Sequence, residues 1–218
     1  MPPDRLLDAV PESERRDLLA SMRRRKFAKG EALFHEGDPG DTLHLVARGR
    51  VAISVTTPMG ETATFIVLGP GDTFGEQALL SADSRRTATA RALEACETQS
   101  LHRDDFERLR LEHPTVERFL TAVLATQVRR LSGHLLDAMY VPADKRVLRR
   151  LVELAAVFGA TDGVATVGVT QEDLATMAGT TRPTVNRVLQ AAQAEGVVNV
   201  ARGRIEISDL GGLERRAR

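Results

Sequence analysis

Glycine and proline are distributed unevenly along this chain of 218 residues, and their distribution divides it into parts that must fold differently. Between residues 25 and 102, short alternating apolar runs are interrupted by turn-forming sequences such as Gly37-Asp38-Pro39-Gly40 and Gly69-Pro70-Gly71. Many short strands separated by glycine-rich turns are typical of a β-sandwich or β-barrel. Residues 11–22, which precede them, have the apolar spacing of a helix.

The pattern changes between Pro114 and Ala138, where Gly133 is the only glycine. Apolar side chains recur there at alternating spacings of four and three residues, which predicts a long helix with one apolar stripe. The stripe consists of Leu124, Val128, Leu131, Leu135 and Ala138. It can pair with a second copy of the helix or pack on its own domain, and the periodicity favours neither alternative.

A third part follows YVPADKRV at residues 140–147, which is typical of a hinge. The third part begins at Ala143, and residues 145–159 (KRVLRRLVELAAVFG) have the pattern of an amphipathic helix that ends at Gly159. Further on, Thr170 precedes Asp173 by three residues, the spacing of a capping box, so a helix is predicted to begin there.

Ala178-Gly179-Thr180 then predicts a tight turn, after which Thr181 would cap a second helix with Pro183 in its first turn. The predicted buried face of that helix consists of Val185, Val188, Leu189 and Ala192. Its opposite face presents Arg182, Asn186, Arg187, Gln190 and Gln193. Two short helices joined by a glycine turn, the second basic on its outer face, predict a helix-turn-helix.

Alternating apolar residues around 198–207 predict a hairpin, or wing, with Arg202 and Arg204 at its tip. From Thr181 to Arg204 the chain has four arginines against the single acidic Glu195. Basic side chains gathered on one surface attract nucleic acid, so we favour double-stranded DNA over a protein as the partner of this segment. Arginines can read guanines, and threonine hydroxyls can hold phosphates. The candidate DNA contacts are Thr170, Thr181, Arg182, Thr184, Asn186, Arg187, Arg202 and Arg204.

Composition excludes several other classes of protein, although the formal net charge of zero decides nothing about nucleic acid. No apolar run approaches the roughly 18 residues of a membrane span, and the N-terminus lacks the apolar core of an export signal. The single Cys96 excludes an intrachain disulfide and a multi-cysteine metal cluster, and its place in an apparent strand predicts a core thiol. We therefore expect a cytoplasmic protein with no membrane partner.

A β-roll, a long helix and a winged helix-turn-helix, in this order, resemble the cyclic AMP receptor protein/FNR family of bacterial transcription regulators over essentially the whole chain. FGEQALLSADSRRTATA (residues 74–90) is similar to the family's phosphate-binding cassette, and TTRPTVNRVL (180–189) to its recognition helix. The resemblance implies an α+β fold with a cyclic nucleotide-binding β-roll (jelly roll) at 1–113, a dimerisation helix at 114–140 and a winged helix-turn-helix at 141–218. It also implies a homodimeric regulator that is not an enzyme, with RNA polymerase as a candidate partner.

The resemblance assigns roles within the cassette. Gly75 would allow close backbone approach at a short helical turn whose N–H groups face an anion. Glu76 matches the position that binds a ribose 2′-hydroxyl, and Arg86 and Thr87 match those that hold the cyclic phosphate. Arg85 is expected to point to solvent. The ligand residues that we assign are Gly75, Glu76, Gln77, Ala78, Arg86, Thr87 and His134. The expected ligand is cyclic AMP or a related cyclic nucleotide, with no other cofactor required and no catalytic or metal-binding residue.

Two positions depart from the family pattern. Where members that respond to cyclic AMP offer Thr or Ser to the purine, this chain has Ser132, His134 and Leu135, which are not a clear match. Where those members read cytosine with a glutamate, this chain has Pro183, so the base preference at that position should differ or relax.

Alternatives from other classes fit less well. A cupin-type metalloenzyme needs converging histidines, but His35 and His44 are nine residues apart and the closely paired His-x-His is absent. An iron–sulfur sensor of the same fold would need N-terminal cysteines, which this chain lacks. A haem sensor stays open because any of the five histidines is a candidate ligand. A regulator that answers to a different effector, or to none, also stays open, and only the cassette argues against it.

Overall fold

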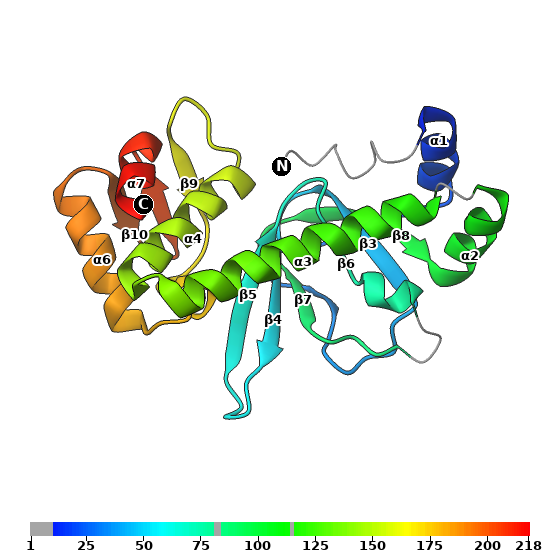
Figure 1. Ribbon diagram of the computed structural model, residues 1–218, viewed down its shortest axis with the longest axis horizontal. Helices are drawn as coiled ribbons and strands as arrows, with labels where there is room; N and C mark the ends of the chain where they lie inside the picture. The colour runs from blue at the N-terminus through cyan, green and yellow to red at the C-terminus, as the bar shows by residue number, and fades with distance from the viewer. Residues whose placement is uncertain (1–10, 81–83, 114–115) are drawn as a thin grey trace. The chain divides into compact units, whose positions relative to one another are not determined.

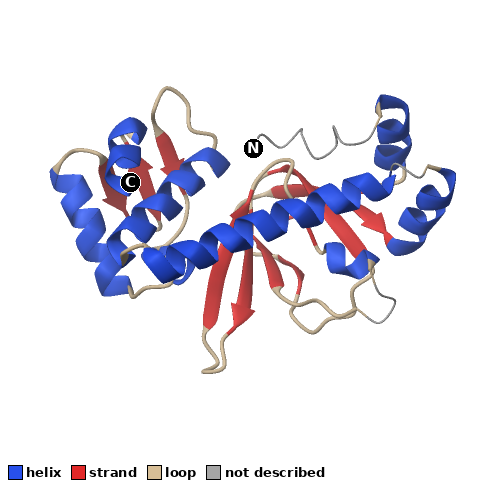
Figure 2. Ribbon diagram, viewed as in Figure 1, coloured by secondary structure: helices blue, strands red, loops and turns tan. Residues whose placement is uncertain are grey.

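The computed structural model describes residues 11–80, 84–113 and 116–218 (Figures 1 and 2). The N-terminal segment used in the export prediction, three residues of the predicted cassette (81–83) and the first two of the predicted long helix (114–115) lie outside these ranges. The chain divides into two compact units, one made mostly of residues before 132 and the other mostly of residues after it. Within the described ranges, no helix has the length and apolar character that crossing a membrane requires.

Two four-stranded sheets form the predicted β-roll. The first has the order β1-β8-β3-β6 and consists of β1 (Arg23–Phe27), β3 (Thr42–Arg48), β6 (Thr73–Phe74) and β8 (Cys96–His102). The second has the order β2-β7-β4-β5 and consists of β2 (Ala32–Phe34), β4 (Val51–Thr56), β5 (Thr62–Leu68) and β7 (Thr89–Ala92). Along β8, Cys96, Thr98 and Ser100 are buried while the residues between them are half-exposed, as strand periodicity requires. Cys96 is thus the predicted core thiol, and burial raises its pKa to about 11.

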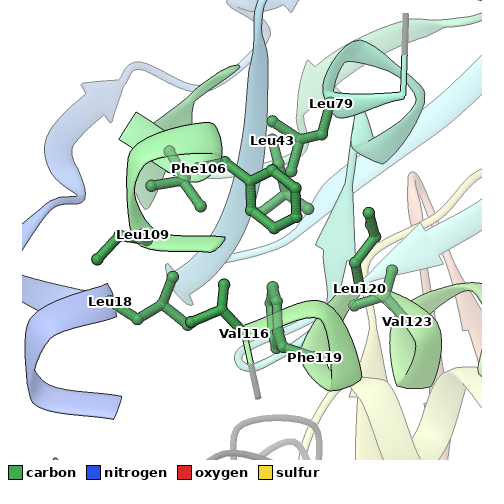
Figure 3. Packing of buried hydrophobic residues seen from close by; sticks show 10 residues of the cluster. Leu18, Leu43, Leu79, Phe106, Leu109, Val116, Phe119, Leu120 and Val123 are labelled. Atoms are coloured by element: carbon green, nitrogen blue, oxygen red, sulfur yellow. The ribbon is translucent and has the colours of Figure 1, made fainter. Parts of the chain in front are cut away.

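A helical layer covers the first sheet and fixes the position of the cassette. It contains α1 (Glu12–Ala20), α2 (Arg103–Glu112) and the first part of α3 (Val116–Tyr140). Figure 3 shows Phe106 of α2 and Phe119 of α3 directed toward Leu43 of β3 and Leu79 of the short helix η3 (Glu76–Leu79). Both phenylalanines are buried, and each such side chain contributes about 1.5–3 kcal/mol of transfer free energy. The cassette helix η3 is therefore packed into the core of this unit.

The second unit contains the predicted helix-turn-helix and wing. Its elements are α4 (Ala143–Val157), β9 (Ala165–Val167), α5 (Gln171–Met177), α6 (Arg182–Ala194), β10 (Val198–Ala201), β11 (Arg204–Ile207) and α7 (Leu210–Ala217). The three strands form an antiparallel sheet of order β10-β11-β9. All four residues of the predicted inner face of α6 are buried, namely Val185, Val188, Leu189 and Ala192. The apolar periodicity therefore predicted this helix and its orientation correctly.

The apolar stripe of α3 is mostly uncovered in the single chain. Leu124 packs partly against the first core, whereas Val128, Leu131 and Leu135 are 62%, 60% and 61% exposed. Leu136, Met139 and Tyr140, which the predicted stripe did not include, are also exposed and widen the apolar face. Packing on its own domain thus accounts for Leu124 alone, and exposed apolar surface of this extent is typical of an interaction site.

Ion pairs join the end of α3 to α4 across the predicted hinge. The Asp137 carboxylate contacts Arg149 at 2.6 Å and the buried Arg150 at 3.0 Å. Arg150 also contacts Glu153, whose other oxygen lies 3.5 Å from Nε2 of His134. Burial would raise the pKa of Glu153, but hydrogen bonds from His134 and Arg150 outweigh it and lower that pKa. Charges on both sides of the hinge therefore hold the two helices together.

Candidate anion-binding site and nucleic-acid interface

The cassette begins at a glycine that no other residue could replace without strain. Gly75 has φ of 76° and forms the N-cap of η3. A Cβ atom added there would lie 2.6 Å from Nη1 of Arg86 and 3.0 Å from the carbonyl oxygen of Thr42. The bare backbone at this position is what lets the guanidinium of Arg86 approach the turn.

Arg86 is the centre of the candidate site. Its Nη1 donates to the Thr42 carbonyl oxygen at 2.7 Å and more weakly to that of Gly75 at 3.3 Å. Its Nη2 donates to the Thr42 hydroxyl at 2.7 Å, and its guanidinium carbon lies 4.1 Å from the centre of the Phe34 ring. These contacts hold the guanidinium flat between a backbone turn and an aromatic face.

Of the three nitrogens of this guanidinium, only Nε makes no hydrogen bond with the described residues, and it is buried. Burial lowers the pKa of Arg86, and the carboxylates of Asp41 and Glu76 oppose that shift. A buried donor without a partner is costly, so the site is suited to an acceptor that the free chain does not supply. A phosphate oxygen would meet both the unused N–H and the positive charge.

The structure brings together some of the predicted ligand residues and separates others. Glu76 and Ala78 are buried in η3, and the Glu76 carboxylate acts on Arg86 electrostatically. Gln77 and Thr87 are exposed, so in this state their side chains are not enclosed with that of Arg86. Arg85 is exposed as expected, and it donates to the carbonyl oxygen of Gly37 at 2.9 Å.

Three further residues of this site have no signal in the cassette sequence. Thr42 and Phe34 come from β3 and β2, and they meet Arg86 only because the roll closes. Arg103, at the start of α2, donates to the carbonyl oxygens of Ala78 and Gly40, both at 2.6 Å. It thereby ties η3 to the turn that precedes β3.

His44 of β3 lies next to this site and is 6% exposed. Its ring stacks on Phe74 with centroids 5.1 Å apart, and its nitrogens lie 3.3 Å from the Thr42 hydroxyl and 3.2 Å from the Thr98 hydroxyl. Burial, helped by the charge of Arg86, lowers the pKa of His44 from 6.5 to about 3. The imidazole is therefore neutral in the folded protein at all ordinary pH values.

This shift predicts a pH dependence of stability. The unfolded chain binds a proton at His44 below about pH 6.5, whereas the folded protein does not, so stability is lost as the pH falls. We expect the wild type to lose up to about 1.4 kcal/mol per pH unit from this group between pH 6 and pH 4. His44→Phe keeps a stacked ring but cannot titrate, so its unfolding free energy should depend less on pH. Urea denaturation of both proteins at several pH values measures the difference, and parallel profiles would contradict a neutral buried His44.

The helix-turn-helix is stabilised by a capping box and by hydrogen bonds from an arginine of α4, which we call the Arg146 clamp. The Thr170 hydroxyl accepts from the Asp173 N–H at 3.1 Å, and the Asp173 carboxylate accepts from the Thr170 N–H at 3.0 Å, which confirms the predicted capping box. At the turn, Gly179 has φ of 58°. Arg146 of α4 donates to the carbonyl oxygens of both Ala178 and Gly179 at 2.8 Å. The sequence showed no sign of this clamp, which fixes the turn on α4.

Thr181 is the N-cap residue of α6 as predicted, but its hydroxyl makes no capping hydrogen bond. It lies instead 3.1 Å from the hydroxyl of Thr184, so the two side chains bind each other. The predicted cap is therefore wrong in its hydrogen bonding although right in its position. Pro183 lies in the first turn, as expected.

Basic side chains are exposed on the outer surface of α6 and on the wing. Arg182, Asn186 and Arg187 are exposed on α6. Residues 202 and 203 form the turn of the hairpin, because Ala201 pairs with Arg204. A groove of about 390 Å³ is lined by Arg182 of α6, by Arg202 and Arg204 of the wing, and by Thr170 and the acidic Glu172 at the start of α5. Arg204 also contacts Glu206 of the same strand at 2.9 Å, so part of its charge is balanced within the chain.

Comparisons with known proteins match the two parts of the chain that contain these sites. The cyclic nucleotide-binding domain family matches residues 24–113, and the Crp-like helix-turn-helix domain family matches residues 145–216. The chain is 36% identical over 197 residues to the cyclic AMP receptor protein of Thermus thermophilus, covering 90% of this chain and 88% of that protein. It is 33% identical over 195 residues to a CRP-like cAMP-activated global transcriptional regulator of Mycobacterium tuberculosis, covering 88% and 87%.

Solved structures give the same result. The Thermus thermophilus catabolite activator protein is 34% identical, with a TM-score of 0.56 and coverage of 99% of this chain and 98% of that one. A transcriptional regulator of the CRP family from Thermus thermophilus is 29% identical, with a TM-score of 0.74 and coverage of 88% and 96%. The fold and the two sites thus define a ligand-responsive, DNA-binding transcription regulator rather than an enzyme. The chain belongs to the cyclic AMP receptor protein/FNR family.

Proposed function

We propose that this protein is a homodimeric transcription regulator that binds cyclic AMP, or a related cyclic nucleotide, and a palindromic DNA operator. The observation that carries the proposal is the buried guanidinium of Arg86, which lies beside Gly75 and whose Nε has no partner among the residues that the structure describes. The names of the two relatives above, a cyclic AMP receptor protein and a cAMP-activated regulator, support the same ligand. The protein would act in the cytoplasm, where the chromosome and its candidate partner RNA polymerase are.

In the proposed complex, the cyclic phosphate accepts hydrogen bonds from Arg86 and from N–H groups at the start of η3. Glu76 accepts from the ribose 2′-hydroxyl, while Gln77, Ala78 and Thr87 line the remaining edge. The exposed Gln77 and Thr87 would contact ligand only after a local rearrangement. His134, the last of the proposed ligand residues, contacts Glu153 in the free chain, so it would have to give up this contact to bind the ligand.

Isothermal titration of the wild type with cyclic AMP, cyclic GMP and the open-chain 5′-AMP tests this ligand class. We expect saturable binding of a cyclic nucleotide and much weaker binding of 5′-AMP, whose phosphate has a different shape and one more negative charge. Absence of binding by both cyclic nucleotides would refute the proposed effector and favour a regulator that answers to another molecule or to none.

The proposed dimer places the exposed stripe of α3 against its copy, which would cover Val128, Leu131 and Leu135. Two-fold symmetry then requires a palindromic operator with half-sites about 34–36 Å apart. We propose a domain boundary at residue 113, a dimerisation helix at 114–140, and a DNA-binding domain from residue 141 onward.

We expect Arg182 and Arg187 to read bases. The other candidate residues should contact mainly phosphates or adjacent base edges; they are Arg202 and Arg204 of the wing, Thr170, Thr181, Thr184 and Asn186. Loss of a bidentate arginine–guanine contact costs about 1–3 kcal/mol of discrimination, whereas loss of a phosphate contact weakens all sequences alike. Arg202→Ala should weaken binding more than Arg204→Ala, because Arg204 is already paired with Glu206.

Selection of randomised operators at fixed salt measures these effects. Arg182→Ala should relax the preference at one position of each half-site, and the base pair next to Pro183 should tolerate substitution. Arg202→Ala should leave the selected sequence unchanged and lower the salt slope by about one charge. If Arg202→Ala relaxed base preference while Arg182→Ala only lowered affinity, α6 would not be the reading helix.

A further inference from the structure

A chain of hydrogen bonds runs from Arg86 into the interior of the roll. Nη2 of Arg86 donates to Oγ1 of Thr42 at 2.7 Å. The same hydroxyl lies 3.3 Å from Nε2 of His44, and Nδ1 of His44 lies 3.2 Å from Oγ1 of Thr98. Both His44 and Thr98 are buried, so the inner half of this chain lies in the interior of the roll.

One arrangement of the protons links every group in this chain. A guanidinium has no acceptor, so the Thr42 oxygen accepts from Arg86. The single proton of the Thr42 hydroxyl can then be donated to Nε2 of His44. In this arrangement Nε2 is unprotonated, and the neutral ring carries its proton on Nδ1 and donates it to Thr98.

Aromatic packing holds the same groups in place. The His44 ring stacks on the Phe74 ring with an interplanar angle of 13°. The centroid of the Phe74 ring lies 5.8 Å from that of Phe34, and the Phe34 ring faces the guanidinium of Arg86. The imidazole therefore cannot turn away without disturbing the surface on which Arg86 rests. These contacts and the hydrogen-bond chain direct the two Nη groups of Arg86 toward Thr42 and Gly75, and they leave Nε without a hydrogen-bond partner among the described residues.

We propose that His44 is a positioning residue for phosphate binding. It acts on the guanidinium of Arg86 through the Thr42 hydroxyl, and it thereby determines which edge of that guanidinium faces the ligand. This rests on the proposed binding of a cyclic nucleotide. His44 itself does not touch the ligand. Its effect should therefore be confined to ligands that carry a phosphate and should vanish when Thr42 cannot transmit it.

The test is a double-mutant cycle read by isothermal titration. Thr42→Val replaces the hydroxyl with a methyl group, and His44→Phe removes the acceptor but keeps a ring on Phe74. Each change should raise the dissociation constant of cyclic AMP by about 5- to 10-fold, and the double variant should lose no more than Thr42→Val alone. His44→Gln, which can place an amide oxygen near the position of Nε2, should recover part of the affinity.

Two further readouts separate positioning from a general effect on folding. The much weaker binding of adenosine, which lacks the phosphate, should be the same in wild type, Thr42→Val and His44→Phe. In the ligand-free wild type, nitrogen NMR of His44 should show the Nδ1-protonated tautomer. Any one of four results would overturn the proposal. These are the Nε2-protonated tautomer, additive losses of cyclic AMP affinity in the cycle, an equal loss of affinity for adenosine, and wild-type affinity of Thr42→Val for cyclic AMP.

The outcomes also distinguish this proposal from the proposed function. If the wild type binds cyclic AMP and Arg86 variants do not, the ligand assignment stands whatever His44→Phe does. A wild type that binds no cyclic nucleotide would overturn the ligand assignment and the positioning role together.

Discussion

Arg86→Leu should raise the dissociation constant for cyclic AMP by at least about 100-fold. Leucine removes the positive charge and the unpaired Nε donor, so a phosphate entering the site would be buried without a matching group. Isothermal titration of purified wild type and variant measures the change directly. Because Arg86 also holds Thr42 and Gly75, thermal unfolding must show that the variant is folded.

Arg85→Leu is the matched control. It removes a neighbouring arginine that is exposed and that donates a hydrogen bond to the Gly37 carbonyl oxygen. We expect its affinity for cyclic AMP to stay within about threefold of the wild type, since losses at exposed sites are usually small. If Arg85→Leu lost binding and Arg86→Leu kept it, the register of the cassette would be wrong by one residue.

If the proposed dimer forms through the stripe of α3, Leu131→Glu should convert it to a monomer. Leu131 is 60% exposed in the single chain, in the middle of the apolar stripe of α3. In a paired helix, the two copies would bury like charges against each other and against apolar side chains, which is strongly unfavourable. The monomer holds only one recognition helix, so its affinity for a palindromic operator should fall by about 100-fold or more.

Sedimentation velocity at micromolar concentration measures the first effect, and operator binding measures the second. Arg129→Glu provides the control, because it introduces the same side chain at an exposed position two residues earlier, outside the stripe. That variant should remain a dimer. Dimers that persist in Leu131→Glu would place the interface elsewhere on the protein.

The fold was predictable because its local signals agree with one another. Buried positions of α6, the capping box of Thr170 and Asp173, and the alternation along β8 are set by neighbours within a few residues. The predicted hinge at 140–147 was too long, because α3 ends at Tyr140 and α4 already begins at Ala143, so residues 143–147 are helical. Periodicity could not say what covers the stripe, because it records only which side chains are apolar.

The candidate site was predictable only in part. Gly75, Glu76 and Arg86 carry their signal in one short segment, but Thr42 lies 44 residues before Arg86 and meets it through the closure of the roll. The sequence offered His44 only as a candidate metal or haem ligand, and its contacts with the Thr42 and Thr98 hydroxyls depend on the closure of the roll. The Thr181 cap failed for a local reason, because a second hydroxyl one turn away offered the side chain another partner.

The central claim is that ligand binding and DNA binding are coupled in one protein. The most direct test is the affinity for a selected palindromic operator, measured by fluorescence anisotropy at fixed salt with and without saturating cyclic AMP. Coupling free energies of about 1–3 kcal/mol predict that the ligand lowers the dissociation constant for the operator by about 5- to 150-fold. Arg86→Leu should retain the affinity of the ligand-free protein under both conditions. An operator affinity of the wild type that is the same with and without cyclic AMP would contradict the claim.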